Sequence, residues 1–256
     1  MKTAITLLTD FGTADYFVGA VKGAILSVNA EAVIVDITHE IPPQDIEAAA
    51  FTLLAAYKTF PAGTIHVAVV DPGVGSTRRP IILSANEQFF VGPDNGIFTY
   101  IYDREPGYQV FHVTADKYFR PEPSSTFHGR DIFAPVAAAL SNGVNPRKVG
   151  PRIDDAVRLP ISLEPEVLEN GDVRARIIHI DHFGNCVTNI TRDLVKPGCI
   201  LTINRKTIRH FRNYYGEDST NTPFAIWGSA GFLEVSVNGG SAAKVLGAKC
   251  GDTVLL

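Results

Sequence analysis

Cysteine is scarce in this chain: three residues among 256, at positions 186, 199 and 250. They are odd in number, far apart and without a CxxC pair, so they favour neither a disulfide framework nor a zinc ribbon. No apolar run reaches the roughly 18 residues that a membrane span needs. The first run, AITLL, is too short for a signal peptide because Asp10 follows closely. These features predict a protein of a reducing, cytoplasmic compartment without a membrane partner.

A basic excess is missing as well. The chain has 23 Lys and Arg against 27 Asp and Glu, which gives a net charge of −4. Nucleic-acid-binding proteins usually carry a basic patch or stripe, so no nucleic acid is expected as a partner. The hydrophobic share of 45% and the charged share of 20% are ordinary for a globular protein. The length suits one large domain or two small ones.

Strands alternate with helices in the first part of the chain. Continuous apolar runs predict buried strands at 4–10, 32–38 and 63–71. Apolar residues at helical spacing predict helices over 15–29 and 44–60. This alternation, with strands apolar on both faces, is typical of a mostly parallel sheet that helices cover on both sides. The sequence therefore predicts an α/β domain.

The alternation then loosens. Further apolar runs predict a hairpin and two helices, at 80–85 with 88–92, at 96–102 and at 131–143. Gly143 is well placed to end the last helix. The stretch 144–160 contains three prolines and six charged residues, and we interpret it as a linker.

Short strands separated by Gly, Asn and Asp follow the linker. We expect them at 173–181, 186–190, 199–204, 223–228, 232–238 and 252–256, with one or two helical turns at 241–247. Such a series indicates an all-β domain, either a barrel or a sandwich. The expected domains are therefore 1–155, of the α/β class, and 165–256, of the all-β class.

Polar residues gather where the predicted parallel strands end. Asp10 follows the first strand, Asp36 and His39 follow the second, and Asp71 follows the third. Ligands of open α/β sheets bind at this edge, although Asp before Gly or Pro is also a common turn residue. The stretch GVGSTRR lacks the GK[ST] ending of a P-loop, and no GxGxxG follows the first strand, which argues against a nucleoside triphosphate or NAD site. Asp10 still suits the hydroxyls of a ribose.

The stretch HIDHFGN, residues 179–185, combines metal-ligand and base-binding residue types. His179, Asp181 and His182 are close in sequence, but HExxH is absent and a solvent-facing position explains His179 as well. No metal site is therefore expected. Asp181, Phe183 and Asn185 fit a nucleobase better, because an aromatic ring can stack on the base and an amide can bond to its edge.

Two further stretches leave alternatives open. In STFHGRDIF, His128 fits a catalytic group, a metal ligand or a residue that neighbours a helix cap. The stretch 227–243 offers small residues and backbone amides that could bind a carboxylate, but a glycine-rich β-turn explains it equally.

Six motifs occur in a fixed order along nearly the whole chain: TDFG with Asp15, DPGVGSTRRP, GPDNG, TFHGRDIFAP, DHFGN and GSAGFLEVSVNGGSAA. Together they resemble the S-adenosyl-L-methionine (SAM) hydroxide adenosyltransferases, or SAM hydrolases, which are relatives of the bacterial fluorinase and chlorinase. The resemblance implies a Rossmann-like N-terminal domain and a β-barrel-like C-terminal domain. It also implies a homotrimer whose active sites lie between the N-terminal domain of one subunit and the C-terminal domain of the next.

The implied reaction is hydrolysis of SAM by attack of water or hydroxide at C5′, giving adenosine and L-methionine. SAM is then the substrate, and no cofactor or metal is expected. The resemblance implies catalytic roles around the attacking water for Asp71, Arg78 and His128. It implies substrate contacts to ribose at Asp10, to the methionine ammonium at Asp181, to adenine at Phe183 and Asn185, and to the methionine carboxylate at Ser229. One departure is Ala230, where the fluorinase has arginine.

Asp71 favours water over a halide on charge grounds alone. A carboxylate repels an incoming fluoride or chloride, whereas it can orient a water molecule and accept its proton. Two alternatives stay open: a halide-dependent transferase of the fluorinase or chlorinase type, and a non-catalytic protein that binds SAM or adenosine.

Overall fold

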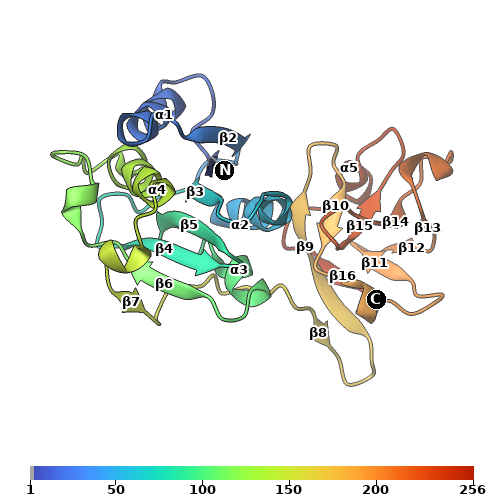
Figure 1. Cartoon of the computed structure of the whole chain (residues 1–256). Helices are drawn as coiled ribbons and strands as arrows, with labels where there is room; N and C mark the ends of the chain where they lie inside the picture. The colour runs from blue at the N-terminus through green and yellow to red at the C-terminus, as the bar shows by residue number, and fades with distance from the viewer. Residues whose placement is uncertain (1–2) are drawn as a thin grey trace. The chain divides into compact units, whose positions relative to one another are not determined.

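A computed structural model describes residues 3–256 and shows a mixed α/β protein (Figure 1). The chain divides into two compact units, one ending at Pro160 and the other beginning at Ile161. The first contains a seven-stranded sheet and the second a nine-stranded sheet. Across residues 3–256, no helix combines the length and the apolar character that a membrane crossing needs.

The first unit contains every strand and helix that the sequence predicted for it. Its strands are β1 (Ala4–Thr9), β2 (Val33–Thr38), β3 (Ile65–Val69), β4 (Pro80–Ala85), β5 (Gln88–Pro93), β6 (Gln109–His112) and β7 (Arg152–Ile153). Its helices are α1 (Phe17–Val28), α2 (Ile46–Ala56), α3 (Thr99–Arg104) and α4 (Ala134–Ser141), with a π-helical turn, Gly129–Phe133, directly before α4. The sequence did not predict β6 and β7. Gly143 follows the last helix with φ of 83°, as expected for a residue that ends it.

The seven-stranded sheet is mixed, whereas we expected it to be mostly parallel. Its order is β2-β1-β3-β5-β4-β6-β7. The strands from β2 to β5 pair in parallel, and those from β5 to β7 pair antiparallel. The cause lies between β4 and β5, where Asn86 and Glu87 form a two-residue turn with φ of 49° and 57°. Such a short connection joins only antiparallel strands.

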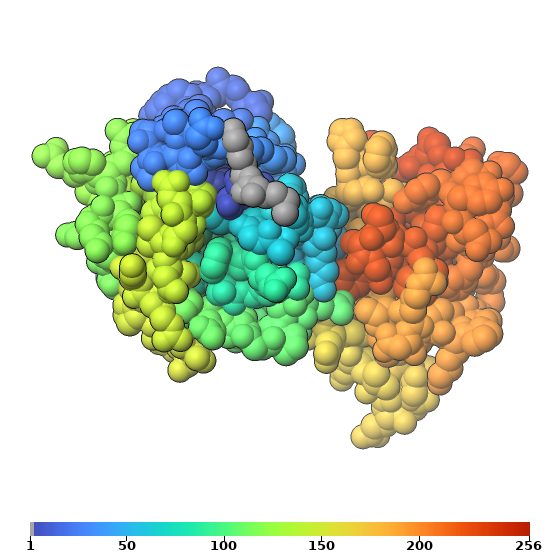
Figure 2. Space-filling model, in the orientation of Figure 1, coloured from blue at the N-terminus to red at the C-terminus, as the bar shows by residue number. Residues whose placement is uncertain are grey.

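Helices cover both faces of this sheet. On one face Ile5 of β1 joins buried residues of α1 and α4, and on the other Leu8 of β1 joins buried residues of α2 and α3. The first pair of helices lies side by side, blue and yellow-green in Figure 2, and Asn29 Nδ2 donates to Ser141 Oγ at 2.8 Å. The burial of β1 on both faces explains its continuous apolar run.

Residues 144–160 are part of the first unit rather than a linker. The backbone N–H of Val157 donates to Asp94 Oδ1 at 2.7 Å, and that of Leu159 donates to Thr99 Oγ1 at 2.8 Å. A segment rich in proline and charge can thus pack by donating its backbone hydrogen bonds to side chains of the unit it covers.

The second unit contains the six strands that the sequence predicted and three further ones, β8, β12 and β13. Its elements are β8 (Glu166–Val167), β9 (Val173–Ile180), β10 (Cys186–Thr188), β11 (Leu201–Ile203), β12 (Lys206–Ile208), β13 (Phe211–Arg212), β14 (Phe224–Trp227), β15 (Leu233–Ser236), α5 (Ala242–Leu246) and β16 (Thr253–Leu255). Eight of the nine strands follow the open order β12-β11-β16-β9-β10-β15-β14-β13, β8 pairs with β9 beside this path, and the sheet curls into a half-barrel (Figure 1). The strand β9 makes this possible because it pairs with β16 along its first part and with β10 along its second.

Candidate functional site

A pocket of about 320 Å³ lies where β1 and β3 of the first unit end. The residues that line it come from four separate segments: Asp10 and Phe11 after β1, Gln44 before α2, Asp71, Pro72 and Val74 after β3, and 126–129 before α4. This is the carboxyl edge of the parallel strands, where sheets of this class bind ligands. Asp10 and Asp71, which the sequence placed at two strand ends, therefore share one pocket.

Arg78 joins Asp71 to His128, and the latter two line the pocket. Two hydrogen bonds join the Arg78 guanidinium to the Asp71 carboxylate. Nε donates to Oδ1 at 3.0 Å, and Nη2 donates to Oδ2. Nη2 also lies 2.7 Å from His128 Nδ1. A guanidinium carries only donors, so Nδ1 must accept, and the imidazole hydrogen is assigned to Nε2. The side chains of Arg78 and Asp71 are 9% and 6% exposed, which makes this a buried ion pair.

His128 is neutral at pH 7 in this setting. Burial and the neighbouring Arg78 cation lower the pKa of His128 from its ordinary value of 6.5, against the weaker opposing effect of Asp71. The pocket thus contains an N–H donor on His128 and a carboxylate on Asp71 whose oxygens can still accept hydrogen bonds. Together these groups can hold and orient a water molecule. Arg78 Nη1 is buried and has no hydrogen-bond partner among residues 3–256.

The local structure fixes the position of His128. The residue directly precedes the π-helical turn Gly129–Phe133, and π-helical turns are frequent at functional sites. Asp131, which is 2% exposed, accepts from Arg130 Nε at 2.7 Å and from the backbone N–H of Ser124 at 2.9 Å. Arg130 and Asp131 therefore brace the turn that carries His128.

Arg79 points away from this group, as the alternation of an extended chain predicts. Its Nε donates to Asp94 Oδ2 at 2.8 Å, and its Nη1 donates to Asp155 Oδ1 at 2.8 Å. Two adjacent arginines thus have separate partners, and Arg78 is the one that contacts Asp71.

The polar residues at the end of β2 bond to the neighbouring elements α1 and β1 instead. Lys22 Nζ lies 2.6 Å from Asp36 Oδ2, and His39 Nδ1 lies 2.8 Å from Thr9 Oγ1. His39 is only 5% exposed, so this group stabilises the strand end next to Asp10.

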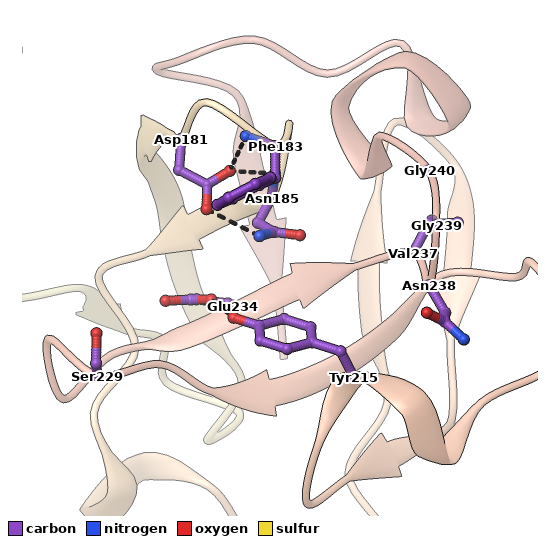
Figure 3. Close-up of a pocket in the computed structure, with 10 residues that line it drawn as sticks. All are labelled: Asp181, Phe183, Asn185, Tyr215, Ser229, Glu234, Val237, Asn238, Gly239 and Gly240. Atoms are coloured by element: carbon purple, nitrogen blue, oxygen red, sulfur yellow. Dashed lines mark hydrogen bonds between the residues drawn. The ribbon is translucent and has the colours of Figure 1, made fainter.

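A second pocket, of about 670 Å³, lies in the second unit (Figure 3). The four residues that the sequence singled out in this unit all line it: Asp181, Phe183, Asn185 and Ser229. Tyr215 and Glu234 line it too, and the sequence analysis missed both.

The DHFGN motif forms a tight turn that Asp181 holds together (Figure 3). Asp181 Oδ1 accepts the backbone N–H groups of Phe183 at 3.0 Å and Asn185 at 2.8 Å, and its Oδ2 accepts Asn185 Nδ2 at 2.8 Å. Gly184 has φ of 84°, and a Cβ there would lie 2.1 Å from Ser241 Oγ, so only glycine fits. The turn presents the Phe183 side chain, 74% exposed, and leaves the side-chain oxygen of Asn185, Oδ1, as an acceptor.

Glu234 and Tyr215 form a polar pair at the base of the same pocket. Glu234 is 7% exposed, and Tyr215 Oη donates to its Oε2 at 3.2 Å. Burial raises the pKa of Glu234, the bond from Tyr215 partly offsets this, and the nearby Asp181 adds to the rise. The signal in the sequence was a single acid between Leu233 and Val235, in a strand that is buried on both faces.

Within residues 3–256, no group of three or more His, Cys, Asp or Glu side chains is placed to hold a metal ion. The stretch 179–185, which the sequence presented as a possible metal site, forms no such group. Its acidic residue is instead used to build the turn.

Comparisons with known proteins place both parts of the chain in one family. Residues 5–150 match the model of the SAM hydroxide adenosyltransferase N-terminal domain, and residues 175–255 match that of the C-terminal domain. The chain is 39% identical to the (R)-S-adenosyl-L-methionine hydrolase of Methanocaldococcus jannaschii, covering 94% of this chain and 91% of that protein. It is 36% identical to the enzyme of the same name from Thermus thermophilus, covering 98% of each.

The chain is also similar to a fluorinase and to a protein of known structure. A fluorinase of Nocardia brasiliensis is 30% identical, covering 77% of this chain and 74% of that protein. The crystal structure of an uncharacterized conserved protein from Thermotoga maritima superposes with a TM-score of 0.91 at 37% identity, covering 98% of both chains.

Proposed function

Because the chain belongs to the SAM hydroxide adenosyltransferase family, we propose that it hydrolyses SAM to adenosine and L-methionine through attack of water or hydroxide at C5′. The observation that carries the proposal is the arrangement of Asp71 and neutral His128 in one pocket, joined by Arg78. The relatives named as hydrolases act on the (R) epimer of SAM, and we extend this preference to the present chain.

The proposed chemistry needs one oriented water. Its oxygen attacks C5′ in line with the C–S bond, at about 3–3.5 Å in the reactive arrangement. The O–C5′ bond forms as the C5′–S bond breaks, and the electron pair goes to sulfur, so methionine leaves as a neutral thioether. Asp71 accepts the proton that the water loses, while the His128 Nε2–H donates to the second lone pair of the oxygen and fixes its direction.

The buried ion pair holds Asp71 in place for this role without using all of its acceptor positions. Arg78 uses one lone pair on each carboxylate oxygen, and a carboxylate has about four acceptor positions, so the oxygens can still accept from water. We assign Arg78 to fixing the positions of the Asp71 carboxylate and the His128 imidazole relative to each other. Its direct contact with the water, which the sequence resemblance implied, stays a prediction.

The remaining residues suit the substrate. We assign Asp10 to the ribose hydroxyls, the exposed Phe183 ring to stacking on adenine, and Asn185 to the base edge. Ser229 and the backbone amides of its turn take the methionine carboxylate, which fits Ala230 in place of a cationic side chain. Neither a cofactor nor a resident metal is part of the proposed reaction.

We also propose the finer architecture and the assembly. The first domain, 1–155, is Rossmann-like, the second, 165–256, is barrel-like, and a cytoplasmic homotrimer brings the water-activating pocket of one subunit to the base-binding pocket of the next. The exposure of Phe183 and of Tyr215, 74% and 46%, supports this, because a pocket that binds an adenine and excludes water needs a cover over these rings.

Two other functions remain as outcomes of one test. Purified protein is incubated with (R)-SAM or (S)-SAM, with and without fluoride or chloride, and the products are separated by chromatography. Hydrolysis predicts adenosine and methionine without halide, and faster release from the (R) epimer. A product of 5′-halo-5′-deoxyadenosine would instead show halide transfer. Tight SAM binding with no product would show a non-catalytic binding protein.

A further inference from the structure

The motif GPDNG, residues 92–96, is not explained by the proposed reaction. Its first two residues end β5, and the others form the bend that follows. The segment that carries Asp71 and Arg78 connects β3 to β4, and β5 lies between these two strands in the sheet. The connection therefore crosses the end of β5, which brings the motif close to both ends of the connection.

Two neighbouring residues of the motif bond to the two ends of this connection. At the β3 end, Asn95 Nδ2 donates to the backbone carbonyl oxygen of Val70 at 2.9 Å. At the β4 end, the backbone N–H of Asp94 donates to the carbonyl oxygen of Arg79 at 2.9 Å. The carbonyl of Val70 and the nitrogen of Asp71 belong to one planar peptide group. The bond from Asn95 therefore fixes the orientation of the peptide that leads into Asp71.

Local structure holds the Asn95 amide in this position. Its Oδ1 accepts the backbone N–H of Ile97 at 3.3 Å. A Cβ at Gly92 would lie 2.4 Å from the carbonyl oxygen of Ala68, so the close approach of β5 to the end of β3 requires glycine. A group that positions a reacting side chain is effective when its own conformation is fixed by such contacts. The Asn95 amide meets this condition.

Rotation of the peptide between Val70 and Asp71 would turn the Asp71 carboxylate away from the attacking water. Reacting groups must lie within about 3–3.5 Å in the correct direction, and a misplacement of about 1 Å can cost roughly 10²-fold in rate. We propose that Asn95 is a positioning residue for hydrolysis, which sets the direction of the Asp71 carboxylate through the Val70 carbonyl. The inference rests on the proposed function for the role of Asp71.

The test measures kcat and KM for adenosine release from SAM, together with adenosine affinity by calorimetry. Asn95→Asp is the sharpest change, because a carboxylate of nearly the same shape still accepts from Ile97 but cannot donate to Val70. Asn95→Ala removes both bonds without adding a charge. Each variant should lower kcat by about 10- to 100-fold. KM and adenosine affinity should stay nearly unchanged, because Asn95 is not among the residues that line either candidate pocket.

A second arm repeats Asn95→Ala in the Asp71→Asn background. If Asn95 acts through Asp71, the added change should lower the remaining rate little further, because groups that act as a unit are not additive. A general weakening of the fold would instead lower the rate by the same factor in both backgrounds, and that result would overturn the inference. A loss confined to KM or to adenosine affinity would overturn it as well.

Arg79→Ala is the matched control. It removes the side-chain bonds to Asp94 and Asp155 but keeps the backbone bond at the β4 end, so it should lose stability and retain most of kcat. An equal loss of kcat in Arg79→Ala and Asn95→Ala would contradict the specific role of Asn95.

A crystal structure of Asn95→Asp provides a readout that does not depend on activity. The peptide between Val70 and Asp71 should be rotated and the Asp71 carboxylate displaced, whereas an unchanged peptide would refute the positioning role. If protein with Asp71 and Asn95 intact released no adenosine from SAM, hydrolysis would be refuted, and the crystal structure would still decide whether Asn95 orients Asp71.

Discussion

The ion pair between Arg78 and Asp71 should be costly to break from either side. Both side chains are more than nine-tenths buried, at 9% and 6% exposure, and two hydrogen bonds join them. Arg78→Met leaves the Asp71 carboxylate buried without its cation. Asp71→Asn leaves a buried guanidinium with a neutral amide as its partner.

The magnitude follows from this burial. Removal of one partner of a buried pair costs about 3–5 kcal/mol, mainly because the other charge stays buried and uncompensated, whereas removal of both is often close to neutral. Each single change should therefore lower the free energy of unfolding by roughly 3 kcal/mol or more. The double variant should be more stable than the sum of the two losses predicts, by about 1–3 kcal/mol.

Urea unfolding followed by circular dichroism checks this, with the melting temperature as a second readout. Lys22→Met is the control, since Lys22 and Asp36 are 35% and 39% exposed and such surface pairs contribute about 0–1 kcal/mol. If Arg78→Met cost no more than this control, or if the two losses were simply additive, the buried pair would not be the unit that we describe.

Four further predictions concern single groups. The pKa of His128 is lowered, so the unfolded state binds its proton first as the pH falls. The stability contributed by neutral His128 should be complete above pH 6.5 and decline below it, and kcat/KM should fall only below pH 6.5, a limb that His128→Gln should lack. An acid limb above that pH would contradict the assignment. Arg79→Ala should lose stability, because Asp94 is 2% exposed, yet keep most of the rate of adenosine release per folded molecule; a loss as large as that in Arg78→Met would show that both arginines serve the site. Gly184→Ala should abolish adenosine binding in calorimetry while the first unit stays folded, since its Cβ would meet Ser241 Oγ at 2.1 Å. Asp10→Ala should weaken adenosine by about 1.5–3 kcal/mol through lost bonds to the ribose hydroxyls, and an unchanged affinity would remove Asp10 from the ribose site.

Much of the first unit could be predicted because its signals are local. The continuous apolar runs of β1 and β3 reflect burial on both faces, and polar residues at their ends had to share one edge of the sheet. The opposite directions of Arg78 and Arg79 follow from the two-residue period of an extended chain. The hairpin that makes the sheet mixed was visible at 80–85 and 88–92, but β6 and β7 were not, since they have four and two residues and only pairing with the sheet makes them strands.

The site residues also divide into those that a local motif brings together and those that meet only in the folded chain. Asp181, Phe183 and Asn185 lie within one short turn, so their grouping in one pocket was visible in the sequence. Glu234 and Tyr215 were not, because 19 positions separate them and their contact depends on how β15 packs against a distant loop. The ligand role of Asp181 stays a prediction, and its three hydrogen bonds within the turn, which appear only once the backbone is folded, add a structural role.

The most direct measurement follows the oxygen that enters the product. Protein with (R)-SAM in water enriched in ¹⁸O should release adenosine that carries ¹⁸O at its 5′ oxygen, in one atom per turnover, while the methionine stays unlabelled. Asp71→Asn should slow this incorporation by about 10²- to 10⁴-fold, the usual contribution of a positioned proton acceptor. Adenosine without the label, or label incorporation that does not depend on Asp71, would contradict attack by a water molecule that this carboxylate activates.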